Sequence, residues 1–284
     1  MSQARYINPY TDFGFKKLFG EDGSKELLID FLNQLLPPQH QIADVYFRNT
    51  ENSADTAMER KAVFDIYCVA NSGERFIVEM QKAKVKYFKD RALFYTTYPI
   101  REQAEKGNWD FRLQAVYFIA ILDFEYDEEE EWRKFRRDVC LKDQDGDVFF
   151  NKLHFRFLQM PLFTKQEHEL ETKFDKWCFF LKNLANIDHI PTILNEPIFQ
   201  KAFQIAEIAN LSQEQRESYE MSLLQYWDWF SVWQTALEEQ HSAIARATAK
   251  SVSTSIAQSM KKKGYVEEEI AELTGLSPEQ IANL

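Results

Sequence analysis

Two acids and an amide lie at alternating positions of a predicted β-hairpin, where their side chains could bind a divalent cation. Residues 63–69 and 75–81 are rich in β-branched and aromatic residues, and the Asn-Ser-Gly sequence between them is typical of a turn. Side chains alternate between the two faces of a strand. With residues 71–73 as the loop, Asp65 lies opposite Glu79, and Gln81 follows two residues later on the same face.

The other face of this hairpin is predicted to be apolar. The same register forms the pairs Phe64–Met80, Ile66–Val78 and Cys68–Phe76. A slip of one residue would exchange the two faces, so the apolar pattern supports this register.

Directly opposed carboxylates repel each other and destabilise a sheet. A hard cation such as Mg²⁺ offsets that repulsion, because it binds carboxylate oxygens and keeps open positions for water and phosphate. The sequence therefore indicates a metal site at Asp65 and Glu79. The alternative is a solvated sheet face whose acids point to water.

The charge of the chain is unfavourable for non-specific binding of nucleic acid. The 284 residues carry a net charge of −11, with 34 Lys and Arg against 45 Asp and Glu. One stretch directly after the hairpin is basic, however, and consists of Lys82, Lys84, Lys86, Lys89 and Arg91. We expect a DNA backbone to lie along these cations, and the alternative is an ordinary basic helix face.

Other features indicate a cytoplasmic protein with a sizeable core. The sequence has 24 Phe and 12 Tyr and no apolar run of the roughly 18 residues that cross a membrane. The first residues lack the apolar run of a signal peptide. Cys68, Cys140 and Cys178 are widely spaced, as in a reduced protein without a zinc site.

The first half of the chain is predicted to alternate helices and strands. Residues 11–36 form a helix interrupted at 20–24, with Asp12 as a candidate cap. A helix over 87–107 places Arg91 and Tyr95 one turn apart, and Pro99 kinks or splits it. The strands are expected at 42–48, 115–122, 139–141, 148–150 and 153–158. Residues 143–147 favour a hairpin turn over a calcium loop.

From Lys165 onward the pattern is helical. Ser212 and Gln215 have the spacing of a capping box, and the aromatic residues of 226–233 are expected to pack against the sheet. Residues 267–284 are expected to form two short helices that look like a helix-turn-helix. The second of these helices has no Lys or Arg, which favours helical packing or self-association over DNA contact.

The order and spacing of these residues resemble a known family. Asp65, followed after thirteen residues by Glu79-Met80-Gln81, is similar to the signature of the PD-(D/E)XK nuclease superfamily, with Gln81 where most members have Lys. The chain most closely resembles the PD-(D/E)XK nuclease family transposases, also called recombination-promoting nucleases. The further matching segments are residues 11–20, Arg91-x-x-x-Tyr95, and residues 270–281.

The resemblance implies a fold and an activity. The fold would be α/β, a restriction-endonuclease-like core with a mixed central sheet flanked by helices, and a helical C-terminal region. Asp65 and Glu79 would bind Mg²⁺ or Mn²⁺, and the chain would be a transposase-like DNA endonuclease that promotes recombination.

Several of the candidate site residues could have more than one role. Gln81 could orient water but supplies no positive charge. Lys61 could supply it if the strand extends that far, whereas Lys82 should point to the other face unless a bulge intervenes. Asp12 could approach the metal or cap its helix. Arg91 and Tyr95 could hold a phosphate or orient Glu79, or Arg91 could form a structural ion pair.

The expected organisation has three parts. Residues 1–165 form the nuclease-like core, residues 166–245 a helical extension packed on it, and residues 246–284 a helical tail. The partner is expected to be DNA and not a membrane. The alternatives are an RNA hydrolase and a catalytically weak or inactive protein that acts through oligomerisation of the C-terminal helices or through partner binding.

Overall fold

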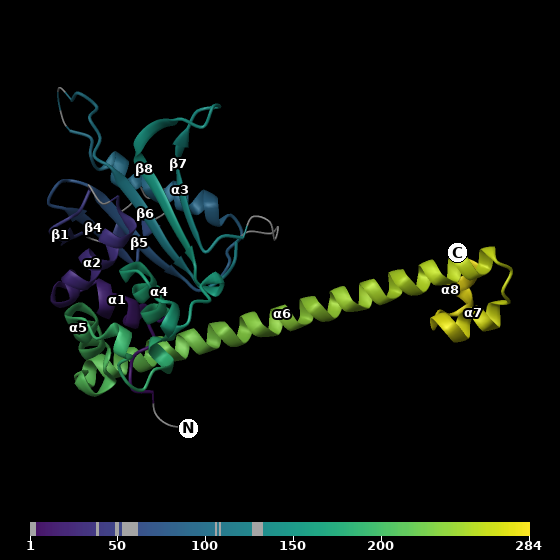
Figure 1. Ribbon diagram of the computed structural model, residues 1–284. Helices are drawn as coiled ribbons and strands as arrows, with labels where there is room; N and C mark the ends of the chain where they lie inside the picture. Colours follow the sequence, from purple (N-terminus) through teal and green to yellow (C-terminus); the bar gives the residue numbers. More distant parts are fainter. Residues whose placement is uncertain are drawn as a thin grey trace. The chain divides into compact units, whose positions relative to one another are not determined.

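The computed structural model describes residues 4–37, 40–48, 51–52, 62–105, 107, 109–126 and 133–284 (Figure 1). Contacts between residues divide the chain into two compact units, Met1–Leu223 and Leu224–Leu284. The division at 165 and 245 that the sequence suggested stays a prediction. No helix within the described ranges is both long and apolar enough to cross a bilayer.

A mixed six-stranded sheet forms the centre of the first unit. Its strand order is β1-β4-β5-β6-β8-β7, and β5, β6 and β8 pair in parallel while the other neighbours are antiparallel. The strands are β1 (Val45–Phe47), β4 (Ile66–Ala70), β5 (Arg75–Gln81), β6 (Val116–Leu122), β7 (Arg136–Lys142) and β8 (Val148–Gln159). A separate ribbon pairs β2 (Glu51–Asn52) with β3 (Ala62–Val63).

The β4–β5 hairpin has the predicted register. Ile66 pairs with Val78 and Cys68 with Phe76. In the turn, the Gly73 amide donates to the Ala70 carbonyl at 2.9 Å, and Gly73 has φ +103°, a conformation that favours glycine.

The alternation of the hairpin breaks before β4 begins. Phe64 was expected on the same face as Ile66, but its ring lies 5.8 Å from Tyr67 and 5.1 Å from Tyr95. Phe64 therefore packs with the residues of the opposite face. The prediction was wrong because residues 64 and 65 lie outside the strand, where the two-residue period no longer holds.

The strands beyond the hairpin confirm most of the expected pattern. Every residue of β6 is buried, and β6 pairs in parallel on both sides, as expected for a central strand. The turn between β7 and β8 is a hairpin, with the Asp143 amide donating to the Asp147 carbonyl at 3.0 Å. Residues 148–150 and 153–158 were predicted as two strands. They form the single strand β8, which continues through a register shift opposite Leu141.

Helices cover both faces of the sheet. Phe88 and Ala92 of α3 (Phe88–Arg101) share a buried cluster with Tyr67, Ile77 and Phe118. The other face is also buried, and Figure 1 shows the remaining helices of the first unit grouped away from α3. These helices are α1 (Asp12–Phe19), α2 (Lys25–Leu35), α4 (Lys173–Asn183) and α5 (Pro197–Ala206).

The ends of two helices differ from the sequence prediction. Thr11, not Asp12, caps α1, because its hydroxyl oxygen accepts from the Gly14 amide at 3.0 Å. Helix α3 ends at Arg101 rather than near 107, and Pro99 lies within its last turn.

A second helical region follows. Helix α6 (Gln213–Lys262) begins with the predicted capping box of Ser212 and Gln215. Its first turns belong to the first unit, where the Tyr219 hydroxyl accepts from the Asn8 amide at 2.9 Å. Within the second unit, Tyr226 and Phe230 stack with ring centroids 6.4 Å apart. The packing of this aromatic cluster against the sheet stays a prediction.

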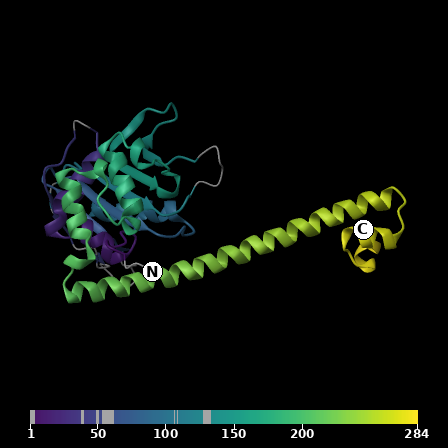
Figure 2. The same ribbon diagram turned by 60° about the horizontal axis from the view of Figure 1, so that its bottom comes forward.

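The C-terminal residues form the two predicted short helices, α7 (Glu267–Thr274) and α8 (Pro278–Ala282). Figure 2 shows them folded back beside the end of α6. Ala257 of α6 packs with Ile270, Leu276 and Ile281, which are all buried.

We predict that Gly14→Ala destabilises the first unit. A side-chain carbon at Gly14 would lie 2.1 Å from the backbone oxygen of Asn8 and 2.8 Å from the Thr11 hydroxyl, so the segment before α1 must move. We expect a loss of about 1–3 kcal/mol in the free energy of unfolding, measured by denaturant titration. The control is Gly23→Ala, where a side-chain carbon meets nothing within 4 Å. Equal stability of the two variants would contradict the prediction.

Candidate active site

The two predicted acids meet at the open end of the β4–β5 hairpin. The Asp65 amide donates to Glu79 Oε1 at 3.2 Å, and the Met80 amide donates to Asp65 Oδ2 at 2.7 Å. Each carboxylate therefore accepts a hydrogen bond from a backbone amide on the opposite side of the hairpin. These side-chain contacts begin where the regular pairing of the strands ends, at Ile66 and Val78.

Glu79 is a buried carboxylate with few compensating charges. Its exposed fraction is 1%, Gln81 Nε2 donates to Oε2 at 2.9 Å, and Arg91 Nη2 lies 3.8 Å from the same oxygen. Burial and the nearby charge of Asp65 raise the pKa of Glu79 to about 8. Burial, with a smaller effect of the Asp12 charge, also raises the pKa of Asp65.

A small cavity of about 120 Å³ opens beside Asp65. It is lined by Tyr10, Thr11, Asp12, Phe15, Asp65, Met80 and Lys82. The structure thus brings Asp12 to the cavity of Asp65, although the Asp12 carboxylate is paired with Lys16 at 2.9 Å.

Lys82 lines the same cavity as Asp65 and Met80, and neither Glu79 nor Gln81 lines it. This agrees with the expectation that Lys82 points away from the face of Glu79 and Gln81. Asp65 differs from the expected alternation, because its carboxylate turns toward the Met80 amide and so comes to the cavity of Lys82. Burial lowers the pKa of Lys82, while the charges of Asp12 and Asp65 raise it.

Arg91 and Tyr95 flank Glu79 from α3. The Arg91 guanidinium carbon lies 4.9 Å from the centroid of the Tyr95 ring, and that ring packs against Phe64. Arg91 is therefore held between an aromatic ring and the buried carboxylate, which fits the orienting and ion-pair roles that the sequence left open.

The remaining predicted residues lie elsewhere. Lys84, Lys86 and Lys89 line a larger groove between α3 and the β7–β8 strands, away from the small cavity. Lys61 lies outside the described residues. The sequence missed Tyr126 and Arg137, which line the same groove. No local motif marks them, because only the sheet brings these residues beside α3.

The donor set fits a hard divalent cation. Mg²⁺ is commonly bound by one or two carboxylates, with waters and phosphate oxygens completing its shell. Asp65 and Glu79 supply two such carboxylates, and a cation bound between them would offset the burial and the Asp65 charge that raise the pKa of Glu79. Among the residues the structure describes, no group of three His, Cys, Asp or Glu side chains could hold a metal. Water and substrate would therefore have to supply further ligands.

Comparison with known proteins identifies one family. A family model described as PD-(D/E)XK nuclease family transposase matches residues 9–236, well over half of the chain. The match confirms the resemblance, and the mixed sheet with flanking helices and a helical C-terminal region confirms the expected fold class. No curated protein and no solved structure matches the chain.

We predict that Glu79→Gln stabilises the metal-free protein at alkaline pH. The pKa of Glu79 rises from an ordinary 4.5 to about 8 on folding, so its ionisation opposes the folded state as the pH rises through this window. Between about pH 5 and pH 8.5 the wild type should lose more stability than the variant, on the order of a few kcal/mol.

The measurement is urea unfolding in EDTA across this pH range, with Glu214→Gln, an exposed glutamate of α6, as the control. The control should follow the wild type. A Glu79→Gln variant with the pH dependence of the wild type would show that Glu79 ionises freely in the folded state.

Proposed function

The chain belongs to the PD-(D/E)XK nuclease family transposases, and we propose that it is a metal-dependent endonuclease that hydrolyses phosphodiester bonds in DNA. The family suggests a nuclease-like function related to recombination. The observation that carries the proposal is the buried carboxylate of Glu79 joined by backbone hydrogen bonds across the hairpin to the partly buried carboxylate of Asp65, whose cavity is also lined by Lys82.

Asp65 and Glu79 are the residues that would hold Mg²⁺ or Mn²⁺. When bound, such an ion supplies Lewis-acid polarisation of the scissile phosphate and activates water as a nucleophile near neutral pH. The backbone amides of Asp65 and Met80 hold the two carboxylates in place across the hairpin before substrate arrives.

Gln81 and Arg91 position Glu79. The Gln81 amide nitrogen holds Glu79 Oε2, which leaves the amide oxygen of Gln81 as an acceptor that can orient the attacking water. The Arg91 charge favours the ionised form of Glu79, the form that binds a cation.

Lys82 supplies the positive charge that Gln81 lacks. Its ammonium group shares the cavity of Asp65, so it can stabilise negative charge on the phosphate during hydrolysis. Asp12 helps to keep Lys82 charged despite its burial.

We predict that Asp65→Asn and Glu79→Gln each lower DNA cleavage by at least about 100-fold, because each removes a carboxylate that the cation needs. The measurement is nicking of supercoiled plasmid in Mg²⁺ or Mn²⁺, with EDTA as the metal-free condition and RNA as a competing substrate. Asp22→Asn, on the short turn before α2, is the control and should keep wild-type activity.

The other outcomes decide between the alternatives. Equal nicking by the wild type and both variants would place the activity outside this site. Faster cleavage of RNA would identify an RNA hydrolase. Absence of cleavage, together with absence of Mg²⁺ or Mn²⁺ binding by calorimetry, would favour a catalytically inactive protein that acts through its partners.

We predict that Lys82→Ala lowers kcat by about 10- to 1000-fold with little change in KM, because the charge acts in the transition state. Lys82→Arg should recover part of the activity because it keeps the charge. Steady-state cleavage of a short duplex at a series of substrate concentrations measures kcat and KM for both variants. If Lys82→Ala raised KM and left kcat unchanged, Lys82 would contribute to substrate binding only.

A further inference from the structure

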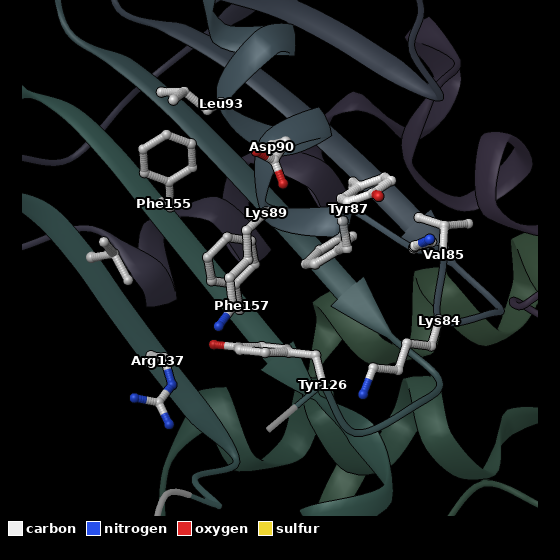
Figure 3. A pocket seen from close by; sticks show the side chains of 13 residues that line it. Lys84, Val85, Tyr87, Lys89, Asp90, Leu93, Tyr126, Arg137, Phe155 and Phe157 are labelled. Carbon is white, nitrogen blue, oxygen red and sulfur yellow. The ribbon is translucent and has the colours of Figure 1, made fainter. Parts of the chain in front are cut away.

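A groove separate from the acids runs between α3 and the β7–β8 strands. We define the basic groove by Lys84, Lys86, Tyr87, Lys89, Tyr126 and Arg137. Its volume is about 1190 Å³, above the range of about 300–1,000 Å³ that is usual for small-molecule sites. Figure 3 shows that these side chains come from three places, with Lys84 after β5, Lys89 on α3 and Arg137 on β7.

The charge of the basic groove is opposite to that of the whole chain. Among the residues that the structure describes, its lining includes the four cations Lys84, Lys86, Lys89 and Arg137 and one acid, Asp90. The chain carries a net charge of −11. A positive groove on an acidic protein selects a polyanion, because its field acts locally while the remaining surface repels negative charge.

The floor of the basic groove is aromatic. The Tyr126 ring lies 5.2 Å from Lys89 Nζ, 5.9 Å from the Arg137 guanidinium carbon and 5.6 Å from the Phe157 ring. Tyr126 and Phe157 are 6% exposed, so they form a firm apolar base under the cations.

Tyr87 provides an exposed aromatic ring at the edge of the basic groove. It is 69% exposed and has φ +72°, a left-handed conformation that is uncommon for a residue other than glycine. The Lys86 ammonium nitrogen lies 5.1 Å from the centre of its ring. Large exposed rings beside cations are the surfaces on which unpaired bases stack.

We propose that the basic groove binds single-stranded DNA. Bases stack on the exposed ring of Tyr87, while Lys84 and Lys89 contact the phosphates, with Lys89 supported by the buried ring of Tyr126. A duplex hides the faces of its bases, so it can use the cations but not the rings. This proposal rests on the proposed nuclease function. It specifies the substrate of that nuclease as DNA that is single-stranded near the position of cleavage.

The basic groove is connected to the acids through the chain. Lys84 follows Lys82 by two residues, and Lys89 precedes Arg91 by two residues. Lys82 lines the cavity of Asp65, and Arg91 lies 3.8 Å from Glu79. The two chain segments that line the basic groove therefore each continue, within two residues, to a side chain beside one of the carboxylates.

Binding is tested by fluorescence anisotropy in EDTA, with a labelled single strand of 20 nucleotides and the duplex of the same sequence. Tyr87→Asn removes the ring and tolerates the left-handed backbone. We expect it to weaken single-strand binding by at least about fivefold and duplex binding by less than twofold. The matched control is Tyr46→Asn on β1, an exposed tyrosine that also lies beside a lysine.

Salt dependence tests the cations. Lys89→Gln should reduce the slope of log affinity against log salt concentration by about 0.7 for the single strand. Lys201→Gln on α5, outside the basic groove, should leave the slope unchanged. Equal weakening of single-strand and duplex binding by Tyr87→Asn, or unchanged binding in both groove variants, would overturn the proposal.

Cleavage in Mn²⁺ separates this inference from the proposed function. Groove-dependent single-strand binding without cleavage would leave the basic groove as a binding site and refute the nuclease function. A second outcome would keep the nuclease function and refute the groove assignment. In that outcome Asp65→Asn abolishes cleavage, whereas Tyr87→Asn has the same effect on the cleavage of single strands as on the cleavage of duplexes.

Discussion

The hydrogen bonds across the open end of the β4–β5 hairpin are the constraint on which the site depends. They hold Asp65 and Glu79 together in a place where burial makes both negative charges costly. The two carboxylates stay close together only if the rest of the fold prevents the hairpin ends from moving apart. The parallel pairing of β5 with the fully buried β6 provides that resistance, because it fixes β5 along its whole length.

The surrounding elements then supply what the two carboxylates lack. Helix α3 brings Arg91 to Glu79, and the start of α1 closes the small cavity where Lys82 lies. The start of α1 lies so close to the backbone of Asn8 that only glycine fits at position 14. The site is therefore assembled from the hairpin and the two helices that cover opposite faces of the sheet.

The distribution of charge is compatible with the proposed anionic substrate, although the protein as a whole is acidic. The cations of the basic groove follow β5 in the chain, and the sheet adds Arg137 from β7 to the same groove. Repulsion from the remaining surface would reduce non-specific binding of DNA, whereas local cations and rings would retain a strand that fits. This combination favours a selective nuclease over one that coats DNA without discrimination.

The sequence by itself determined the family, the hairpin register, the capping box of α6, and the buried central strand. These features follow from short-range periodicity and turn chemistry. Only the tertiary structure decided that Phe64 changes face, that Lys82 joins Asp65, and that Arg137 lies across from Lys89. The physical reason is that alternation ends with the strand, and residues far apart in sequence meet only through sheet pairing and helix packing.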